Sequence, residues 1–415
     1  MVFPVFSSIQ TRENITRWLI LAYLFFLSTS FNFLNFGGRN ILFIIVACLV
    51  ISLLVFIWPT FFQWKRSSIF MLLVYMPISF LINYQNASLI SLLYSVFFVV
   101  SFVIVISFGT TCLTKNDIYF IIKRLLIAYF LVTVCAQLYV AFGLFKMDSG
   151  SIQGHGLFGT VFTSESNSIR FYSLSSEPSY ASTIIVFFYY LFTRISIQLE
   201  IKKKSGYIFF FVLYMVISFT SGFGFLLFAI FLWLNLKGKS PTIAIASVVL
   251  LSVLFTILLF TDLNLFALVR IRNIIKMFDF SDWTSLKSID YSASFRVLPF
   301  YYYLKSVNLF DLNFYLGHGA AVSDKILNVF LFPHIHDDSF SFQGGFLPGF
   351  LIDYGLIGFL LIFYAFIKET KSMFSFGAIS MLFVLVNANF NTQLFWIVFT
   401  FLTLENKVNK NEDTN

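Results

Sequence analysis

The sequence predicts an all-α polytopic membrane protein with about twelve transmembrane helices. Its 415 residues are 59% hydrophobic and only 11% charged, whereas soluble domains carry about 25% charged residues. Apolar segments near the roughly 20 residues needed to cross hydrocarbon recur along the whole chain, joined by polar links. These observations predict a protein of the lipid bilayer and no nucleic-acid partner.

Twelve apolar segments are the expected spans. They lie at 17–36, 40–61, 67–84, 88–111, 124–145, 180–197, 206–220, 222–236, 241–261, 346–366, 372–387 and 389–404. The combined length of the stretch 206–236 favours two spans joined by a tight turn at Ser221-Gly222. The first span is expected to remain in the protein, because the apolar run from Trp18 lacks the small-residue pattern of a signal-peptide cleavage site.

Positive charges are distributed unevenly between the two sets of links. One set carries Arg12, Arg17, Lys65, Arg66, Lys115, Lys123, Arg124, Arg194, Lys202, Lys203, Lys204, Lys237, Lys239, Lys368, Lys371, Lys407 and Lys410. The opposite short links hold only Arg39. Cytoplasmic links are enriched in Lys and Arg, and this set alternates correctly with twelve spans. We therefore expect a single membrane domain, residues 1–415, with both termini in the cytoplasm.

Two long loops then face the periplasm or the cell exterior, and all four histidines lie in them. The first loop, 147–179, is rich in Gly and Ser. The second loop, 262–345, contains amphipathic helical patterns at Leu265–Met277 and Phe295–Leu309, which predict a small helical cap. Long loops of ordinary complexity tend to be functional.

Several kinds of chemistry are not expected. Cys48, Cys112 and Cys135 fall in or at the ends of apolar runs, without disulfide or zinc spacing. The chain has neither a P-loop nor a dinucleotide fingerprint, so direct nucleotide chemistry and a cofactor are not expected.

The first candidate group ends the first loop, in the segment from Arg170 to Tyr180. Proline suits the first helical position, so Pro178 places Glu177 at the N-cap of the sixth span. The exposed N–H groups of such a helix end attract anions, and Arg170, seven residues earlier, could bind a phosphate through its planar fork. In the alternative interpretation Glu177 only caps the helix, and Arg170 pairs with Glu177 or with lipid phosphate.

The second loop supplies Arg296 and the segment Gly317-His318-Gly319. Arg296 opens an amphipathic stretch and could bind phosphate, or it could form a salt bridge with one of the acids of the loop. The two glycines predict a turn, on which His318 could be a site residue or an exposed bystander.

The segment His334-Ile-His336-Asp337-Asp338 could suggest a metal ion. A third and a fourth ligand at familiar spacing are missing, so no metal is expected. A histidine beside carboxylates is a better candidate for a general base, because its unperturbed pKa lies near neutrality. The alternative is that both histidines are surface residues.

Asp353 lies inside the tenth span, about two turns from its outer end. An acid within a membrane span is costly and is by default a functional-site hypothesis. The competing interpretation is a role in helix packing, together with the small residues Gly355 and Gly358.

Together these residues resemble a known family, the Wzy-type polysaccharide repeat-unit polymerases of the O-antigen polymerase and ligase group. The resemblance covers most of the chain in topology. Three motifs carry it: Arg170 with Ser-Ser-Glu177-Pro178-Ser179; Arg296 with the glycines around His318; and His336-Asp-Asp-Ser-Phe340 with Asp353-Tyr-Gly355-Leu-Ile-Gly358. The chain departs from the family where Asp337 replaces the usual Asn and where Thr220-Ser-Gly222 lacks the usual arginine.

The resemblance implies a reaction and a location. A glycan carried on undecaprenyl pyrophosphate would be transferred onto the non-reducing end of the next lipid-linked repeat unit, at the periplasmic face of the bacterial inner membrane. His336 and Glu177 would be catalytic, Arg170 and Arg296 would bind the pyrophosphate, and Asp353, Tyr180, His318 and Asp337 are further candidates. A chain-length regulator protein is implied as a partner.

Two alternatives remain open at the level of sequence. An O-antigen ligase would share the topology and differ in its acceptor. A lipid-linked oligosaccharide flippase should carry several charges within its spans, whereas Asp353 is nearly alone in the apolar runs of this chain.

Overall fold

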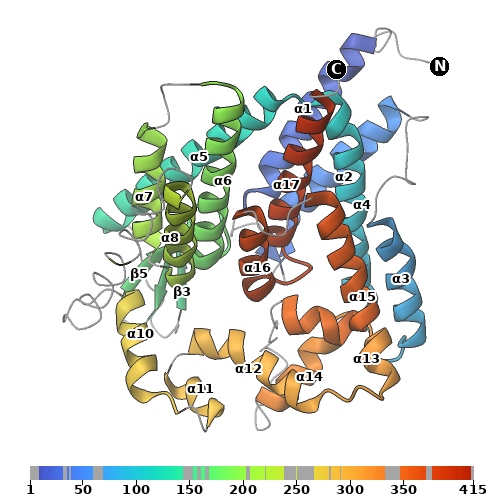
Figure 1. The fold of residues 1–415 in the computed structure, drawn as a ribbon, viewed down its shortest axis with the longest axis vertical. Helices are drawn as coiled ribbons and strands as arrows, with labels where there is room; N and C mark the ends of the chain where they lie inside the picture. The colour runs from blue at the N-terminus through green and yellow to red at the C-terminus, as the bar shows by residue number, and fades with distance from the viewer. Residues whose placement is uncertain are drawn as a thin grey trace. The chain divides into compact units, whose positions relative to one another are not determined.

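The computed structural model is mainly helical (Figure 1). It describes residues 9–30, 35–36, 39–58, 69–143, 153–156, 160–163, 168–201, 206–219, 221–237, 249, 266–279, 282–289, 291–331, 346–370 and 376–412. These residues belong to two compact units. Unit 1 comprises Met1–Leu27, Leu42–Ile118 and Phe295–Asn415, and unit 2 comprises Ser28–Ile41 and Tyr119–Ser294.

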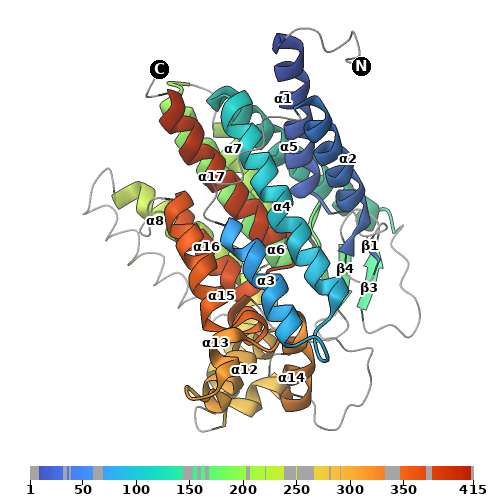
Figure 2. The ribbon, with the colours of Figure 1, turned by 90° about the vertical axis from the view of Figure 1, so that its right-hand side faces the viewer.

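The helices of unit 1 come from both ends of the sequence. They are α1 (Ile9–Leu27), α2 (Ile41–Ile57), α3 (Phe70–Ile82), α4 (Leu89–Cys112), α12 (Tyr291–Ser306), α13 (Leu312–Leu316), α14 (Val322–Leu331), α15 (Phe346–Thr370), α16 (Phe376–Asn387) and α17 (Gln393–Glu412). Figure 2 shows α4 and α17 side by side. Aromatic rings fill their contact: Trp396 stacks on Phe98 with ring centres 5.6 Å apart, and Phe399 stacks on Phe102 at 4.6 Å.

Unit 2 is built around α6. Its elements are β1 (Asn35–Phe36), β2 (Arg39–Asn40), α5 (Lys115–Ala141, from Tyr119), β3 (Gln153–Gly156), β4 (Thr160–Thr163), β5 (Ser168–Phe171), α6 (Pro178–Gln198), α7 (Gly206–Phe219), α8 (Gly222–Lys237), α10 (Phe266–Met277), the 3₁₀ turn η5 (Trp283–Ser285) and α11 (Leu286–Ile289). Helix α6 packs against both α7 and α8. A Cβ added to Gly224 of α8 would lie 2.7 Å from Ser182 Oγ of α6, so glycine permits this close approach.

The described helices match the expected spans in part. A helix overlaps every expected span except 241–261, which lies outside the described residues apart from residue 249. The bounds differ most at α1, which ends at Leu27 rather than at 36, and at α5, which begins at Lys115 rather than at 124. Within the described part of the chain, four helices are long and apolar enough to cross a bilayer: Leu89–Cys112, Lys115–Ala141, Pro178–Gln198 and Phe346–Lys368. The stretch 206–236 forms two helices, α7 and α8, as predicted.

Two further predictions concern the structure of the two long loops, 147–179 and 262–345. The amphipathic patterns of the second loop do form helices, α10 and α12. The first loop contains a three-stranded antiparallel sheet in the order β3-β4-β5, which the sequence analysis did not predict. Each strand has four residues, and an alternation that short is too weak to distinguish from a loop.

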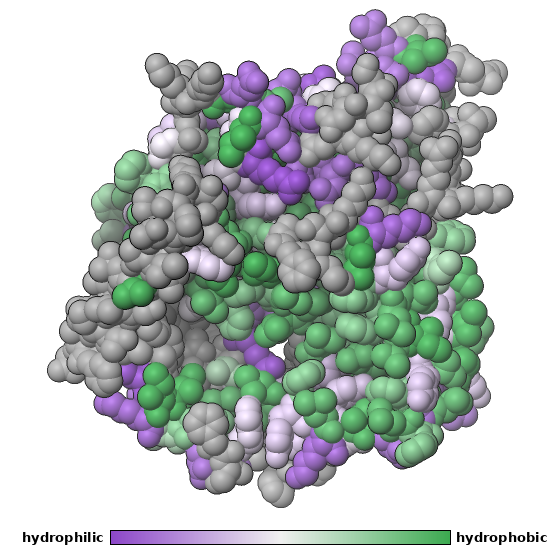
Figure 3. Space-filling view, in the orientation of Figure 1, coloured by the Kyte–Doolittle hydropathy of each residue, from purple (hydrophilic) through white to green (hydrophobic). Residues whose placement is uncertain are grey.

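The apolar surface of unit 1 follows the outer faces of α3 and α15. It is visible in green on the right of Figure 3. Its exposed side chains include Val74, Ile78, Leu81, Ile357 and Leu360. Contiguous exposed apolar surface of this kind is typical of helices that face lipid tails.

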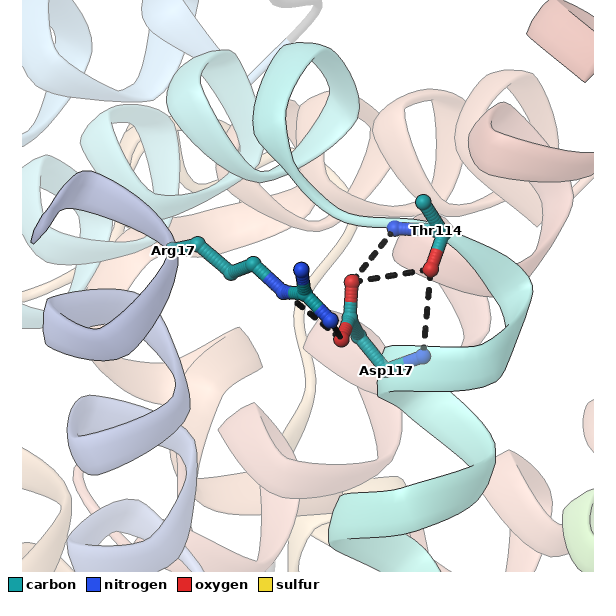
Figure 4. Close-up of polar contacts among 3 residues, drawn as sticks. All are labelled: Arg17, Thr114 and Asp117. Atoms are coloured by element: carbon teal, nitrogen blue, oxygen red, sulfur yellow. Dashed lines mark hydrogen bonds and ion pairs between the residues drawn. The ribbon is translucent and has the colours of Figure 1, made fainter. Parts of the chain in front are cut away.

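The start of α5 is fixed to α1 by an ion pair. Asp117 accepts hydrogen bonds from the Arg17 guanidinium, one of them 2.8 Å from Nε, and its second oxygen accepts from Thr114 N and Oγ1, both at 2.9 Å (Figure 4). Thr114 Oγ1 in turn accepts from Asp117 N. This is a capping box, a Thr and an acid three residues apart that satisfy the free N–H groups of a helix start.

Helices α1 and α17 run in opposite directions in unit 1, so the start of α1 and the end of α17 lie toward the same end of the unit. A Cβ added to Gly109, near the end of α4, would lie 2.7 Å from the Leu404 side chain of α17 and 3.9 Å from the Ile20 side chain of α1. At the other end of the unit, Gln393 of α17 donates to the carbonyls of Phe26 and Leu27 at the end of α1.

Candidate functional site

Glu177 occupies the N-cap of α6, as predicted, and Pro178 is the first helical residue. The backbone of Glu177 is extended, with φ −147° and ψ 152°, and its side chain makes no capping hydrogen bond. The carboxylate is exposed and accepts a weak hydrogen bond from Ser179 Oγ at 3.4 Å. Glu177 therefore caps the helix through its backbone, and its carboxylate is accessible.

The turn that precedes Glu177 is buried and firmly held. Tyr129 of α5 donates its hydroxyl to Ser28 O at 2.7 Å and to Leu174 O at 3.3 Å. Ser173 Oγ donates to Tyr129 O at 2.7 Å, and Ser30 N donates to Leu174 O at 2.6 Å. These bonds fix the segment that connects β5 to α6, so the position of Glu177 is set by buried contacts rather than by a loose loop.

Arg170 and Tyr180 lie on either side of this turn. Arg170 is in β5, where its backbone is opposite Val161 of β4; its side chain lies outside the described part of the chain. Tyr180 is in the first turn of α6 and is half-buried. Both belong to unit 2 together with Glu177.

Arg296 belongs to unit 1, in α12. Its Nε donates to Asn387 Oδ1 at 2.7 Å, at the last residue of α16. A helix C-terminus favours a nearby cation. The hydrogen bond to Asn387 holds the guanidinium beside the end of α16.

His318 and Asp353 meet at a backbone contact that we call the glycine crossing, formed by residues 315–319 and 352–355. His318 N donates to Ile352 O at 2.8 Å, and Gly319 N donates to Asp353 O at 2.9 Å. A Cβ on Gly317 would lie 2.6 Å from Gly355 N, and a Cβ on Gly355 would lie 2.5 Å from Gly317 N. The two chain segments therefore touch backbone to backbone.

Gly355 also interrupts α15. Its φ of 64° and ψ of −174° are not helical, and that region is essentially restricted to glycine. Non-helical backbone within a membrane protein must be satisfied by other protein groups. Here the side chains of α3 contribute: Tyr75 donates its hydroxyl to Tyr354 O at 2.9 Å and to Leu316 O at 3.0 Å.

The carboxylate of Asp353 binds the start of α14. It accepts from Ser323 N at 2.7 Å and from Ala321 N at 3.1 Å. The residue therefore provides, from another helix, the oxygen that an N-cap side chain usually provides. Of a functional and a helix-packing role for Asp353, the contacts favour a structural role. Its carboxylate, however, binds the start of α14 and does not pack with Gly355 or Gly358.

His318 is half-buried beside α15. Burial lowers the pKa of its imidazole, and the nearby Asp311 carboxylate opposes this effect only in part. A lowered pKa favours the neutral ring, which can both donate and accept a hydrogen bond.

The remaining predicted residues of the second loop, His334, His336, Asp337 and Asp338, lie outside the described residues. Among the residues that the structure does describe, no group of three or more His, Cys, Asp or Glu side chains could hold a metal ion.

Sequence reasoning missed the residues that hold the crossing. Tyr75, Ser79 and Asn83 are spaced four apart, so they share one face of α3. Ser79 Oγ donates to Leu316 O at 3.1 Å, and Asn83 Nδ2 donates to Gly317 O at 3.2 Å. A row of polar side chains along an otherwise apolar helix was the available signal.

The structure thus brings together some of the predicted residues. His318 and Asp353 meet in unit 1, where Arg296 also lies, and Arg170, Glu177 and Tyr180 lie on consecutive elements of unit 2. Neither a family model, nor a curated protein, nor a solved structure matches this chain.

Proposed function

We propose that this chain is a Wzy-type polysaccharide polymerase, a glycosyltransferase of the bacterial inner membrane. It transfers a glycan chain from undecaprenyl pyrophosphate onto the non-reducing end of a lipid-linked repeat unit, at the periplasmic face. The observation that carries the proposal is the glycine crossing. Two segments that separately resemble motifs of this family, around His318 and from Asp353 to Gly358, are in direct contact.

The chemistry requires a cationic site for the leaving group. The donor already carries pyrophosphate, so its departure needs positive charge and no nucleotide. Arg170 and Arg296 are the proposed ligands of the pyrophosphate. The hydrogen bond that holds the Arg296 guanidinium at the end of α16 supports this role, because it fixes the position of the cation.

The attacking sugar hydroxyl needs a general base. His336 is the proposed base, and Glu177 is the second candidate. The exposure of the Glu177 carboxylate, on a turn held by buried hydrogen bonds, supports its part in the site. A chain-length regulator protein is a proposed partner.

The proposed topology has twelve spans with both termini in the cytoplasm. The alternation of Lys- and Arg-rich links supports it. So does the contact of Gly109 with Leu404 and Ile20, because it gathers the first and last helices at one end of unit 1.

A flippase is the alternative from another class. A transporter of this kind should use ionisable groups within its spans. The carboxylate of Asp353 already binds two N–H groups of α14, which weakens this alternative. A ligase would differ only in its acceptor.

Complementation of a host that lacks its own polymerase tests the proposal. Lipopolysaccharide from cells with the wild-type chain should show a ladder on a gel. Arg170→Ala, Glu177→Ala, Arg296→Ala and His336→Ala should each leave only core plus one repeat, at unchanged protein level. Arg12→Ala and Glu200→Ala are matched controls that should keep the ladder.

The same gel separates the alternatives. A flippase defect would leave no repeat attached to the core, and a ligase defect would leave polymer that is not joined to the core. Normal ladders from both Arg170→Ala and Arg296→Ala would refute the pyrophosphate site.

A further inference from the structure

Unit 1 contains a pocket whose lining does not include Arg296. It lies between the end of α12, the helices α13 and α14, and the outer half of α15, which Figure 1 draws in yellow to orange. It is a small, partly open pocket. All of its lining residues belong to unit 1.

The pocket lining combines apolar and polar groups. Leu327 and Ile352 are buried aliphatic residues, and Tyr303 and Phe314 contribute aromatic rings. The polar lining side chains are Ser306, Asn308, Asp311, Asn313 and His318. Pockets that bind small molecules typically pair apolar walls with a few placed polar groups.

The polar groups retain capacity for a ligand. Asp311 Oδ1 accepts from Asn313 N at 3.0 Å, which leaves its second oxygen available. Asn308 Oδ1 accepts from Phe310 N at 3.0 Å, so its NH₂ group remains a donor. The imidazole of His318, whose neutral form is favoured by burial, can both donate and accept a hydrogen bond.

The charge of the lining argues against an anionic ligand. The described residues that line the pocket include Asp311 but neither Lys nor Arg. A phosphate would meet a carboxylate without a compensating cation. A lipid chain would leave the amides and the imidazole without hydrogen-bond partners, which is costly in a partly buried site.

We propose that this pocket binds one neutral sugar ring of the glycan. A sugar presents an apolar C–H face, which suits the rings of Tyr303 and Phe314, and a rim of hydroxyl groups that both donate and accept. The polar side chains of Asn308, Asp311, Asn313 and His318 supply the complementary rim.

The wall of the pocket is fixed before the ligand arrives. The bond from His318 N to Ile352 O joins two lining residues through the glycine crossing, and preorganised sites lose less entropy on binding. The choice of a glycan as the ligand rests on the proposed function, but the chemistry of the lining supports a neutral polyhydroxylated ligand independently.

Binding of free sugars tests the inference without requiring polymerisation. The full-length protein in lipid nanodiscs is mixed with a panel of methyl glycosides of common hexoses and N-acetylhexosamines, and saturation transfer to the sugar protons is measured by NMR. At least one glycoside should bind. Loss of one neutral hydrogen bond in Asn313→Ala, or of a stacking ring in Tyr303→Leu, should weaken binding about threefold to tenfold.

The control is Tyr302→Leu, which removes a neighbouring tyrosine that is not part of the pocket lining. It should leave binding unchanged, and thermal unfolding of each variant establishes that the protein is folded. Inorganic pyrophosphate should not compete with the glycoside.

Three results would overturn the inference: no glycoside in the panel binds, Asn313→Ala and Tyr303→Leu both bind like wild type, or pyrophosphate displaces the sugar. If one of these three results is found in a chain that forms ladders in the complementation assay, sugar binding in this pocket is refuted and the proposed function stands. Sugar binding that Asn313→Ala weakens, in a chain that forms no ladder, would refute the polymerase and leave the pocket standing.

Discussion

Replacing Gly355 with alanine should destabilise the protein strongly. A Cβ at this position would lie 2.5 Å from Gly317 N and from Tyr315 C. Both atoms are backbone, so neither can move aside as the tip of a side chain could. The φ of 64° with ψ of −174° adds a conformational cost that every L-residue would bear.

The two costs can be estimated separately. Holding a non-glycine residue in this region costs about 1–3 kcal/mol, and forcing a methyl group into a closely packed contact costs about 1–3 kcal/mol more. The sum, about 2–6 kcal/mol, is a large share of the roughly 5–15 kcal/mol by which proteins are stable.

Thermal unfolding in detergent, followed by fluorescence-detected size exclusion, measures the effect. Gly355→Ala should lower the midpoint by at least about 5 °C, because each kcal/mol corresponds to about 2–4 °C in domains of moderate size. Two control variants separate the causes. Gly143→Ala has a φ of 68° and open space around its Cβ, so it should show only the conformational cost, and Gly222→Ala, which also has open space, should be neutral or slightly stabilising.

A midpoint for Gly355→Ala equal to that of Gly143→Ala would refute the backbone contact at Gly317. A midpoint equal to wild type would refute the crossing as a whole.

Three further predictions follow from the polar contacts of unit 1. Asp353→Ala should lower the free energy of unfolding by about 2–4 kcal/mol, since two hydrogen bonds to the start of α14 are lost. Asp353→Asn should lower it less, because one acceptor oxygen remains. Equal thermal stability of both variants and wild type would contradict the capping role. Burial raises the pKa of Asp324 to about 6 from 3.8, so the folded state holds the proton more tightly and stability should fall as pH rises from about 4 to about 6. Asp324→Asn should flatten this slope and stabilise the protein by about 1–3 kcal/mol at pH 7.5. An unchanged pH profile in Asp324→Asn would contradict this prediction. Asp117→Ala should cost about 1–2 kcal/mol through loss of the capping box. Arg17→Ala should cost about 1–3 kcal/mol, because Asp117 is only 4% exposed and would keep its charge without a cation, although the arginine itself is 43% exposed. Wild-type stability of either variant would contradict the role of this contact.

Much of the helical layout could be predicted because hydropathy and proline position act locally. Pro178 set the start of α6, and the apolar runs located most of the longer helices, although the bounds of α1, α5 and α17 differ from the expected spans by up to nine residues. The capping box of Thr114 and Asp117 was also readable, since a Thr and an acid three residues apart before an apolar run are its signature.

The candidate site could be predicted only in part. Glu177 at a helix start follows from its neighbour in sequence, so that prediction was confirmed. The partner of Arg296 is an amide 91 residues away, and no local pattern selects Asn387 over other polar residues. The β-sheet of the first loop was missed because its strands are too short for period-two alternation to be recognised.

The sequence by itself determined that the protein is helical and apolar, where most helices begin and end, and which few polar residues are available for chemistry. These properties depend on neighbours within one or two helical turns. Only the tertiary structure decided what those polar residues contact. Asp353 looked like an isolated acid in an apolar run, and it became the cap of α14 because α15 breaks at Gly355. That break is tolerated because Tyr75, which is 241 residues from Leu316, supplies a hydrogen bond at the crossing. Hydrogen-bond partners of this kind depend on which distant segments pack together, and packing is a property of the whole fold.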